Sequence, residues 1–243
     1  AAVCPTGAIV IKNDRMKLWD EFDKEDVKVV AQIAPAVRVA VAKSFGLNEG
    51  NVMGKIVAAM HRIGFEEVFD TVTGADLTVL EEANEFLERL SKGENLPLFT
   101  SCCPGWINYA EINYPSLFDN ISSCKSPQQM LGALIKNYLG KDNIYHIAVM
   151  PCTAKKHEAL RPEMYTEGGR DVDAVLTVRE YAKLLRSKGI NLAKLQDSEY
   201  DSLFGNTSGA GRIFGTSGGV TEAAIRSMYE LMTGEILTDV EFK

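Results

Sequence analysis

The sequence lacks any apolar run that approaches the roughly 20 residues of a membrane-spanning helix, and no signal-peptide pattern opens it. It also lacks a basic excess, because 26 Lys and Arg face 33 Asp and Glu. The resulting net charge of -7 argues against binding to a phosphate backbone. Collagen-like, low-complexity and disordered chains are excluded by composition. What is present is 46% hydrophobic residues in 243 positions, enough for one large core or two smaller ones.

Cysteine is scarce, with five residues at Cys4, Cys102, Cys103, Cys124 and Cys152. An odd number without a secretory segment is a poor disulfide framework, and the adjacent Cys102 and Cys103 cannot pair without strain. We therefore expect a reducing, cytoplasmic compartment. The thiols are then either small buried side chains or ligands of a metal centre.

Segments with the pattern of strands alternate with segments of helical periodicity. The expected strands are Val27–Ile33, Glu67–Thr71, Leu96–Phe99, Ile144–Met150, Asp173–Leu176 and Ile236–Phe242. The expected helices are Asn51–Ile63, Leu77–Leu90, Gln128–Leu139, Val178–Ser187 and Val220–Leu231. This alternation predicts parallel βαβ units in an α/β fold. Ligands of such sheets bind beyond the carboxyl ends of the strands.

Two cysteine motifs follow expected strands. The stronger is TSCCPGW at residues 100–106, where paired thiols beside Pro and Gly suit a backbone that wraps a thiolate-ligated centre. Thiolates favour soft metals and iron–sulfur clusters. The second is MPCTAKKHE at residues 150–158, where two lysines follow one thiol. Those lysines either donate hydrogen bonds to an anionic ligand or form a solvated pair at a helix start.

The expected helix Leu77–Leu90 carries several glutamates whose faces can be compared. Its apolar face comprises Leu77, Leu80, Ala83, Phe86, Leu87 and Leu90. Glu81 and Glu88 fall opposite that face and read as solvated, whereas Glu82 falls at its edge. Glu82 is therefore expected to be semi-buried, with a raised pKa suited to proton transfer, and Glu85 to be its wetter, outer partner.

The two cysteine motifs, in this order, resemble the first two signatures of iron-only (FeFe) hydrogenases. Further matches are IAP at 33–35, GAD at 74–76, EE at 81–82, SPQQ at 126–129, SGAG at 208–211 and GGV at 218–220. The resemblance runs from about residue 27 to residue 243. It implies an α/β fold with two lobes of mostly parallel sheet flanked by helices, a cluster cleft between the lobes, and an incomplete second lobe.

The resemblance also implies an activity and its cofactor. In this family four cysteines hold a 4Fe-4S cubane, one of them bridging to a two-iron subcluster with CO and cyanide ligands, and this H-cluster interconverts H₂ with protons and electrons. Cys103 and Cys152 match the first two cubane ligands. Cys102 matches the proton-relay thiol, and Lys155 the lysine that holds a cyanide.

Other positions match the surroundings of the cluster. Ala34, Pro35 and Met150 correspond to residues packed around the two-iron subcluster. The remaining matches belong to the proton path and its surroundings, and they are Glu82, Ser122, Glu85 and Glu158. Cys124 reads as a packed side chain, and the histidines show no metal spacing.

Residues 1–26, with Cys4-Pro5, resemble the tail of a ferredoxin-like domain and a linker, followed by a catalytic domain over residues 27–243. The family's third cysteine motif, with the remaining cubane ligands, is absent. We therefore expect this chain alone to be an apo, inactive fragment that needs a missing C-terminal segment. Electron partners would be ferredoxin or a linked redox domain or subunit. An unpaired sheet edge would invite self-association.

Two alternatives remain open. Relatives of hydrogenases in iron–sulfur protein assembly, and hydrogen sensors, bind a 4Fe-4S cluster without turnover. Cys102 and Lys155 argue against the assembly protein, because a relay thiol and a cyanide-holding lysine have little purpose there. The retention of Cys102 also argues against the sensor.

Overall fold

The computed structural model describes residues 4–48, 50, 52–140, 143–166, 169–203, 205 and 207–237. Within these residues, four parallel strands form one sheet in the order β2-β1-β3-β6. The strands are β1 (Lys28–Ile33), β2 (Glu67–Asp70), β3 (Ile144–Met150) and β6 (Ala174–Thr177). β1 and β3 are nearly continuous apolar runs, as expected of parallel strands that are buried on both faces.

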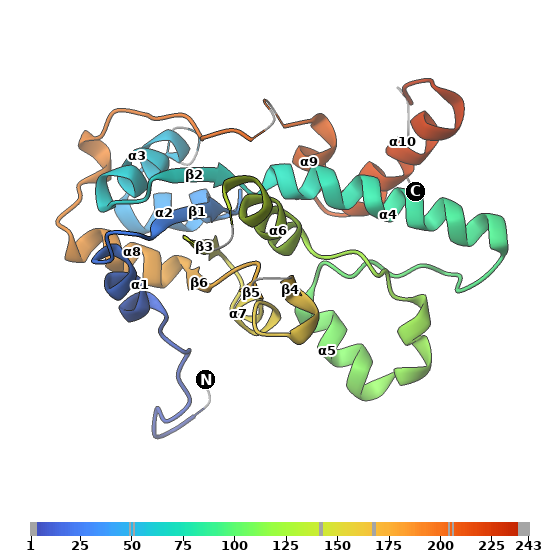
Figure 1. Ribbon diagram of the computed structural model, residues 1–243, viewed down its shortest axis with the longest axis horizontal. Coiled ribbons are helices and arrows are strands. Elements are labelled where there is room, and N and C mark those ends of the chain that lie inside the picture. The colour runs from blue at the N-terminus through green and yellow to red at the C-terminus, as the bar shows by residue number, and fades with distance from the viewer. Residues whose placement is uncertain are drawn as a thin grey trace.

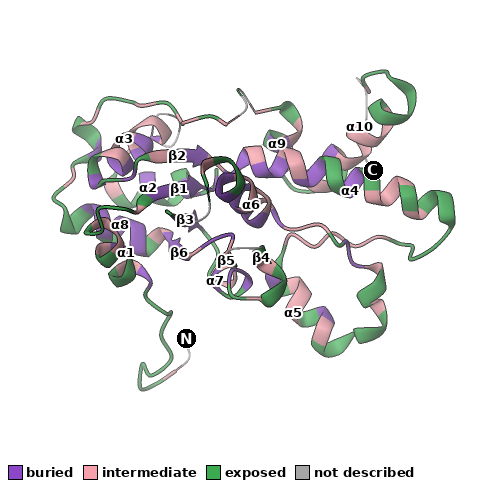
Figure 2. Ribbon diagram, in the orientation of Figure 1, coloured by how far each residue is buried: buried purple, intermediate pink, exposed green. Residues whose placement is uncertain are grey.

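One lobe is built on this sheet (Figure 1). Its helices are α1 (Arg15–Phe22), α2 (Val37–Phe45), α3 (Met53–Ile63) and α8 (Val178–Ser187). Figure 2 shows that burial is concentrated here. The short helix α7 (Ala154–Glu158) follows β3. A small antiparallel pair, β4 (Tyr165–Thr166) and β5 (Gly169–Arg170), lies beyond it.

The rest of the chain extends to one side of the sheet (Figure 1). It contains α4 (Val72–Lys92), α5 (Pro104–Asn113), α6 (Pro127–Leu139), α9 (Gly209–Ile213), α10 (Gly219–Thr233) and the 3₁₀ helix η2 (Pro115–Asn120). α4 and α6 approach closely at Gly74, where an added Cβ would lie 2.2 Å from the carbonyl oxygen of Pro127.

The predicted α/β class, with a parallel sheet flanked by helices, is confirmed. The strand predicted at Leu96–Phe99 is wrong, since only Phe99 pairs, in a single parallel bridge to Ile121. Pro97 has no N–H to donate to a ladder, which limits pairing there. The strand predicted at Ile236–Phe242 lies mostly outside the described residues.

α4 covers the predicted Leu77–Leu90 and extends it at both ends. Its predicted apolar face is only partly covered, because Leu80 and Leu90 are 46% and 52% exposed. The outer part of α4 and much of α5 are exposed in Figure 2. In the described part of the chain, no helix combines the length and apolar character that crossing a bilayer requires.

A buried ion cluster joins the segment before α1 to α7. The Lys156 ammonium lies 2.7 Å from an Asp14 carboxylate oxygen and 3.1 Å from one of Glu180, and donates to the Val175 carbonyl at 2.5 Å. Glu180 also accepts from the backbone and hydroxyl of Thr177 in a capping box that starts α8. Lys156 is therefore not half of a solvated lysine pair.

Replacing Lys156 with Met should destabilise the fold strongly. Two buried carboxylates would lose their cation, a change that typically costs ~3–5 kcal/mol. Urea denaturation should show a much lower midpoint for Lys156→Met than for wild type. Lys92→Met removes a lysine from an exposed ion pair with Glu88 and should leave the midpoint unchanged. Equal midpoints for the two variants would contradict the role given to the cluster.

Candidate active site

A cavity of about 210 Å³ lies at the carboxyl ends of the strands, and we call it the strand-end cavity. From the strand ends it is lined by Ala34, Pro35, Thr71, Met150, Pro151 and Cys152. From the other segments it is lined by Val72, Ala75, Cys102, Pro127, Gln128, Lys155, Gly211, Phe214 and Gly215. The position agrees with the expectation for parallel sheets. Six sequence-predicted site residues thus meet around one cavity: Ala34, Pro35, Cys102, Met150, Cys152 and Lys155.

Backbone pairing brings the two strand-end motifs together. In the β1–β3 ladder Ile33 is in register with Val149, and the amide of Ala34 donates to the Val149 carbonyl at 3.1 Å. Ala34-Pro35 therefore lies beside Met150-Pro151-Cys152, although more than a hundred residues separate them in sequence.

Lys155 is the cation at this cavity. Its ammonium donates to the carbonyl of Cys102 at 2.9 Å and to both carboxylate oxygens of Glu158 at 3.0 Å. Glu158 is buried, and it also accepts from the side-chain amide of Gln128 at 3.1 Å. This network ties α7 to α6 and to the Cys102 backbone.

Gln128 is a site residue for which the sequence suggested no role. Its amide nitrogen must face Glu158, because an ionised carboxylate can only accept hydrogen bonds. The amide oxygen is then left buried without a partner among the described residues. Gln32 on β1 donates to the Gln128 carbonyl at 2.8 Å and so holds the start of α6 beside the strand ends. The SPQQ motif at 126–129 was the available signal.

The two thiols expected to ligate a cubane are both accessible. Cys103 and Cys152 are exposed, whereas Cys102 and Cys124 are half-buried. Cys103 caps the N-terminus of α5, where Pro104 occupies the first turn. The described residues contain no cluster of three or more His, Cys, Asp or Glu side chains arranged to hold a metal ion. Cys103 and Cys152 offer two exposed thiols, which are soft donors of the kind that iron–sulfur centres use.

Cys102 is coupled to a buried carboxyl. Burial raises the pKa of the Cys102 thiol, and the nearby negative charge of Glu82 raises it further. Glu82 is 2% exposed, so it is more deeply buried than its helical position predicted. Burial also raises the pKa of Glu82, against a hydrogen bond that one of its oxygens accepts from the Ser101 amide at 3.3 Å. Its other oxygen has no partner in the described residues.

Glu85 lies one helical turn from Glu82 on α4, is less deeply buried, and is hydrogen-bonded to Ser122. The Ser122 hydroxyl donates to Glu85 at 2.5 Å, and Arg89 donates to Glu85 at 2.7 Å. Burial alone would raise the pKa of Glu85, but hydrogen bonds from Ser122, Ser123 and Arg89 outweigh it and lower that pKa. Glu81 and Glu88 are exposed, as their position on the helix predicted.

Arg89 was not predicted from the sequence. Besides Glu85 it donates to the carbonyls of Asn95, Asp119 and Ile121, and so holds the 119–123 segment against α4. Its spacing of four residues from Glu85 is typical of a helical ion pair and was the available signal.

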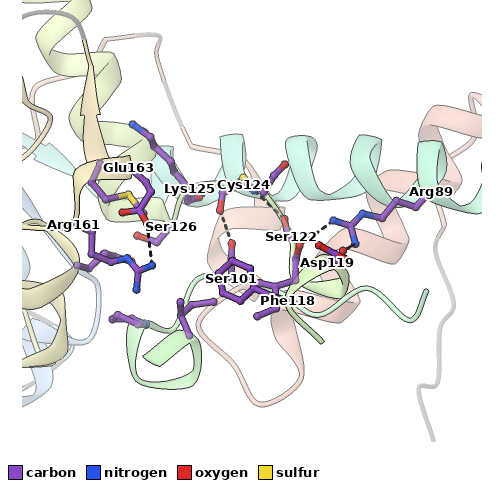
Figure 3. Close-up of a pocket in the computed structure, with 16 residues that line it drawn as sticks. Arg89, Ser101, Phe118, Asp119, Ser122, Cys124, Lys125, Ser126, Arg161 and Glu163 are labelled. Atoms are coloured by element: carbon purple, nitrogen blue, oxygen red, sulfur yellow. Dashed lines mark hydrogen bonds and ion pairs between the residues drawn. The ribbon is translucent and has the colours of Figure 1, made fainter. Parts of the chain in front are cut away.

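A second cavity of about 430 Å³, the outer cavity, opens beside this group (Figure 3). Arg89 and Arg161 lie at opposite sides of this cavity in the view. Between them, the Ser101 hydroxyl donates a hydrogen bond to the Cys124 carbonyl. Ser122 and Glu158 also line it. Burial raises the pKa of Cys124 to about 12, which disfavours a ligating thiolate. This is consistent with the packing role expected for Cys124.

Two of the three histidines make contacts with other protein groups. His146 is fully buried between Gln32 and the Asp171 carbonyl, and burial lowers its pKa to about 4. His61 contacts Asp201 at 3.4 Å. Both arrangements fit structural roles.

Comparison with known proteins shows that the chain is an iron-only hydrogenase domain. A model of the family described as iron only hydrogenase large subunit, C-terminal domain, matches residues 27–243, and the chain belongs to this family. Over 255 residues it is 45% identical to the NADP-reducing hydrogenase subunit HndD of Solidesulfovibrio fructosivorans, covering 100% of the chain and 44% of that relative. It is 48% identical over 226 residues to the periplasmic Fe hydrogenase large subunit of Nitratidesulfovibrio vulgaris, covering 89% and 54%.

One less similar curated relative is named as an iron–sulfur assembly protein and not as a hydrogenase. The chain is 36% identical over 231 residues to the cytosolic iron–sulfur assembly component 3 of Bos taurus, covering 88% of the chain and 48% of that relative. Among solved structures, a cysteine-to-histidine variant of apo FeFe-hydrogenase HydA1 from Chlamydomonas reinhardtii is similar with a TM-score of 0.83 at 42% identity. That match covers 95% of the chain and 61% of the solved one. The chain therefore spans about half the length of the curated relatives it matches.

The raised pKa of Glu82 predicts a pH dependence of stability. The folded protein keeps this proton at pH values where the unfolded chain, with a glutamate pKa of about 4.3, has lost it. The free energy of unfolding therefore falls as pH rises from that value through the raised pKa. In Glu82→Gln this fall should disappear, so the variant should gain stability over wild type across that window in urea denaturation series.

Glu88→Gln is the matched control on the same helix. A hydrogen bond to Lys92 lowers the pKa of Glu88, which is the opposite direction from Glu82, so Glu88 is not a source of the fall in stability and the wild-type fall should persist. A wild-type slope in Glu82→Gln would show that Glu82 is not the titrating group.

Proposed function

We propose that the whole protein is an FeFe hydrogenase that catalyses reversible H₂ oxidation and proton reduction at an H-cluster. The observation that carries this proposal is the position of Cys102. Cys102 lines the strand-end cavity together with Lys155, which donates to its carbonyl, and the charge of buried Glu82 raises the pKa of its thiol. A titratable thiol at an apolar cavity, backed by a buried carboxyl, is an arrangement for delivering protons to a dry site.

The residues around the cavity suit the cluster that the family implies. When bound, the H-cluster would supply the redox chemistry and the site of H₂ formation and cleavage. Cys103 and Cys152 would ligate its cubane part. Lys155, held by Glu158, would donate a hydrogen bond to a cyanide, and Met150 with Ala34-Pro35 would form apolar walls that exclude water.

The proton path would run through the residues with shifted pKa values. Raised pKa values keep the thiol of Cys102 and the carboxyl of Glu82 protonated to higher pH, so both can donate. Ser122 and Glu85 would connect Glu82 to the surface, where the lowered pKa of Glu85 suits exchange with water. The buried groups Cys102 and Glu82 thus favour holding a proton, whereas Glu85 nearer the surface favours releasing it.

For this chain alone we propose an apo state without turnover, because two thiolates cannot enclose a cubane. A segment outside the sequence would supply the remaining ligands. Residues 1–26 would link to a ferredoxin-like domain, and a ferredoxin or linked redox subunit would exchange electrons. We propose the cytoplasm as the compartment, and we propose that an exposed sheet edge makes self-association of the isolated chain favourable.

A second candidate is an iron–sulfur assembly protein, which the relative from Bos taurus favours. Such a function needs the cubane ligands but no proton relay. Hydrogen sensing is a third, and it too requires no turnover. The placement of Cys102 and Lys155 at one cavity favours the enzyme over both.

Cys102→Ala in the full-length protein should separate these functions. The variant should keep the iron content of wild type but lose ~100-fold or more of its hydrogen evolution, as expected when a proton-transfer group is removed. Cys124→Ala removes a neighbouring thiol from the packed region and should keep both iron and turnover. Full turnover in Cys102→Ala would rule out the relay, and absence of turnover in wild type would favour the assembly function.

The fragment proposal has its own test. The 243-residue chain, reconstituted with iron and sulfide, should fail to hold a stoichiometric cubane, measured as bound iron and sulfide per chain. Full cluster occupancy in this chain would overturn the proposal that further ligands are required.

A further inference from the structure

α9 is a single helical turn with cavities around it. Gly211 lines the strand-end cavity, together with Phe214 and Gly215 just after the helix. Ser208, Gly209 and Ala210 line a cavity of about 480 Å³ between α4 and α10. Arg212 lines a further cavity of about 340 Å³. Between these cavities the turn packs against α4 and α10, and specific polar contacts to α4 add to that packing.

Those contacts converge on one carboxylate of α4. Asp76 accepts hydrogen bonds from the Ser208 amide at 2.8 Å, from the Gly211 amide at 2.7 Å, and from the Ser208 hydroxyl. The Ser208 hydroxyl in turn accepts from the Ala210 amide at 3.1 Å and caps the turn. Hydrogen bonds to an ionised acceptor are stronger than those between neutral groups.

The backbone of α9 also lies directly against α4. A Cβ added at Gly211 would come within 2.6 Å of an Asp76 carboxylate oxygen and 2.7 Å of the Val72 carbonyl oxygen. Only glycine permits this approach, so the SGAG motif at 208–211 and the GAD motif at 74–76 are two halves of one contact. Neither motif is explained by cluster ligation or by the proton path.

We infer that Asp76 is a positioning residue for the strand-end cavity: its carboxylate latches α9 to α4, so that Gly211, Phe214 and Gly215 close part of the wall of the cavity that Cys102 lines. The latch controls how readily small solutes reach Cys102. The inference concerns the empty cavity and does not depend on hydrogenase activity.

Alkylation of Cys102 by iodoacetamide tests the latch without iron or hydrogen. The 243-residue chain is purified metal-free with Cys103→Ser and, after alkylation, is cleaved after its glutamates. Residues 95–111 then form a peptide in which Cys102 is the one thiol, and mass spectrometry follows it separately from Cys124. In Asp76→Asn the side chain loses its charge and one acceptor oxygen. Cys102 should then react about tenfold faster. This change corresponds to a loss of about 1.4 kcal/mol from the free energy that holds α9 against α4.

Cys124 is the internal control, because it is half-buried away from the wall that α9 forms. Its alkylation should stay within about twofold of wild type. Glu88→Gln removes an exposed carboxylate from the same helix and should change neither rate. Ser208→Ala removes one of the three donors and the cap, and should give a smaller acceleration at Cys102 alone.

Two results would overturn the inference. Unchanged Cys102 reactivity in Asp76→Asn would show that α9 does not govern access to the cavity. Equal acceleration at Cys102 and Cys124 would show that Asp76 supports the fold in general. If Asp76→Asn does not fold, Ser208→Ala tests the inference instead. An unchanged alkylation rate of Cys102 in Ser208→Ala would then contradict it.

Discussion

The parallel pairing of β1 with β3 is the constraint on which the site depends. Its last hydrogen bond, from Ala34 to the Val149 carbonyl, places two distant loops side by side at one edge of the sheet. Both strands are buried on both faces, so a one-residue shift of register would turn every side chain of β1 or β3 into the packing of the opposite face. The strand side of the strand-end cavity is therefore set by the sheet, and Met150 and Cys152 take their positions from the end of β3, whereas the α9 side is held by Asp76.

Around this edge, burial and hydrogen bonding divide the ionisable groups into two kinds. Cys102 and Glu82 are desolvated and hold their protons more tightly, whereas Glu85 is stabilised as an anion by Ser122, Ser123 and Arg89. α4 carries both glutamates on neighbouring faces of one helix, so a single element spans the dry and the wet sides. The neighbouring lysines of α7 also have different roles. Lys155 lines the cavity, whereas Lys156 pairs with Asp14 and Glu180 and so holds the helix in place.

Much of this arrangement could be predicted from local patterns. The alternation of strands and helices predicted the parallel sheet, and the helical position of Glu82 predicted a carboxyl on the protected side of α4. The sequence could not predict features set by distant partners. The Leu96–Phe99 segment is apolar but finds a single pairing partner, and Leu80 stays exposed although its spacing is that of a buried residue. The role of Lys156 follows from its ion pair with Asp14, and that of Gln128 from its hydrogen bond to Glu158. Both partners are distant in sequence and come close only in the folded chain.

We propose that Cys103 and Cys152 ligate a cubane beside the strand-end cavity, which Cys152 also lines, and that this cavity takes a second metal group. Anomalous diffraction at the iron edge, on crystals of the full-length protein, tests it most directly. The account predicts iron peaks bonded to both thiols and further iron inside the cavity between Met150, Cys102 and Lys155. Iron at the two thiols with none in the cavity would contradict the account and would match a cluster-binding protein without turnover.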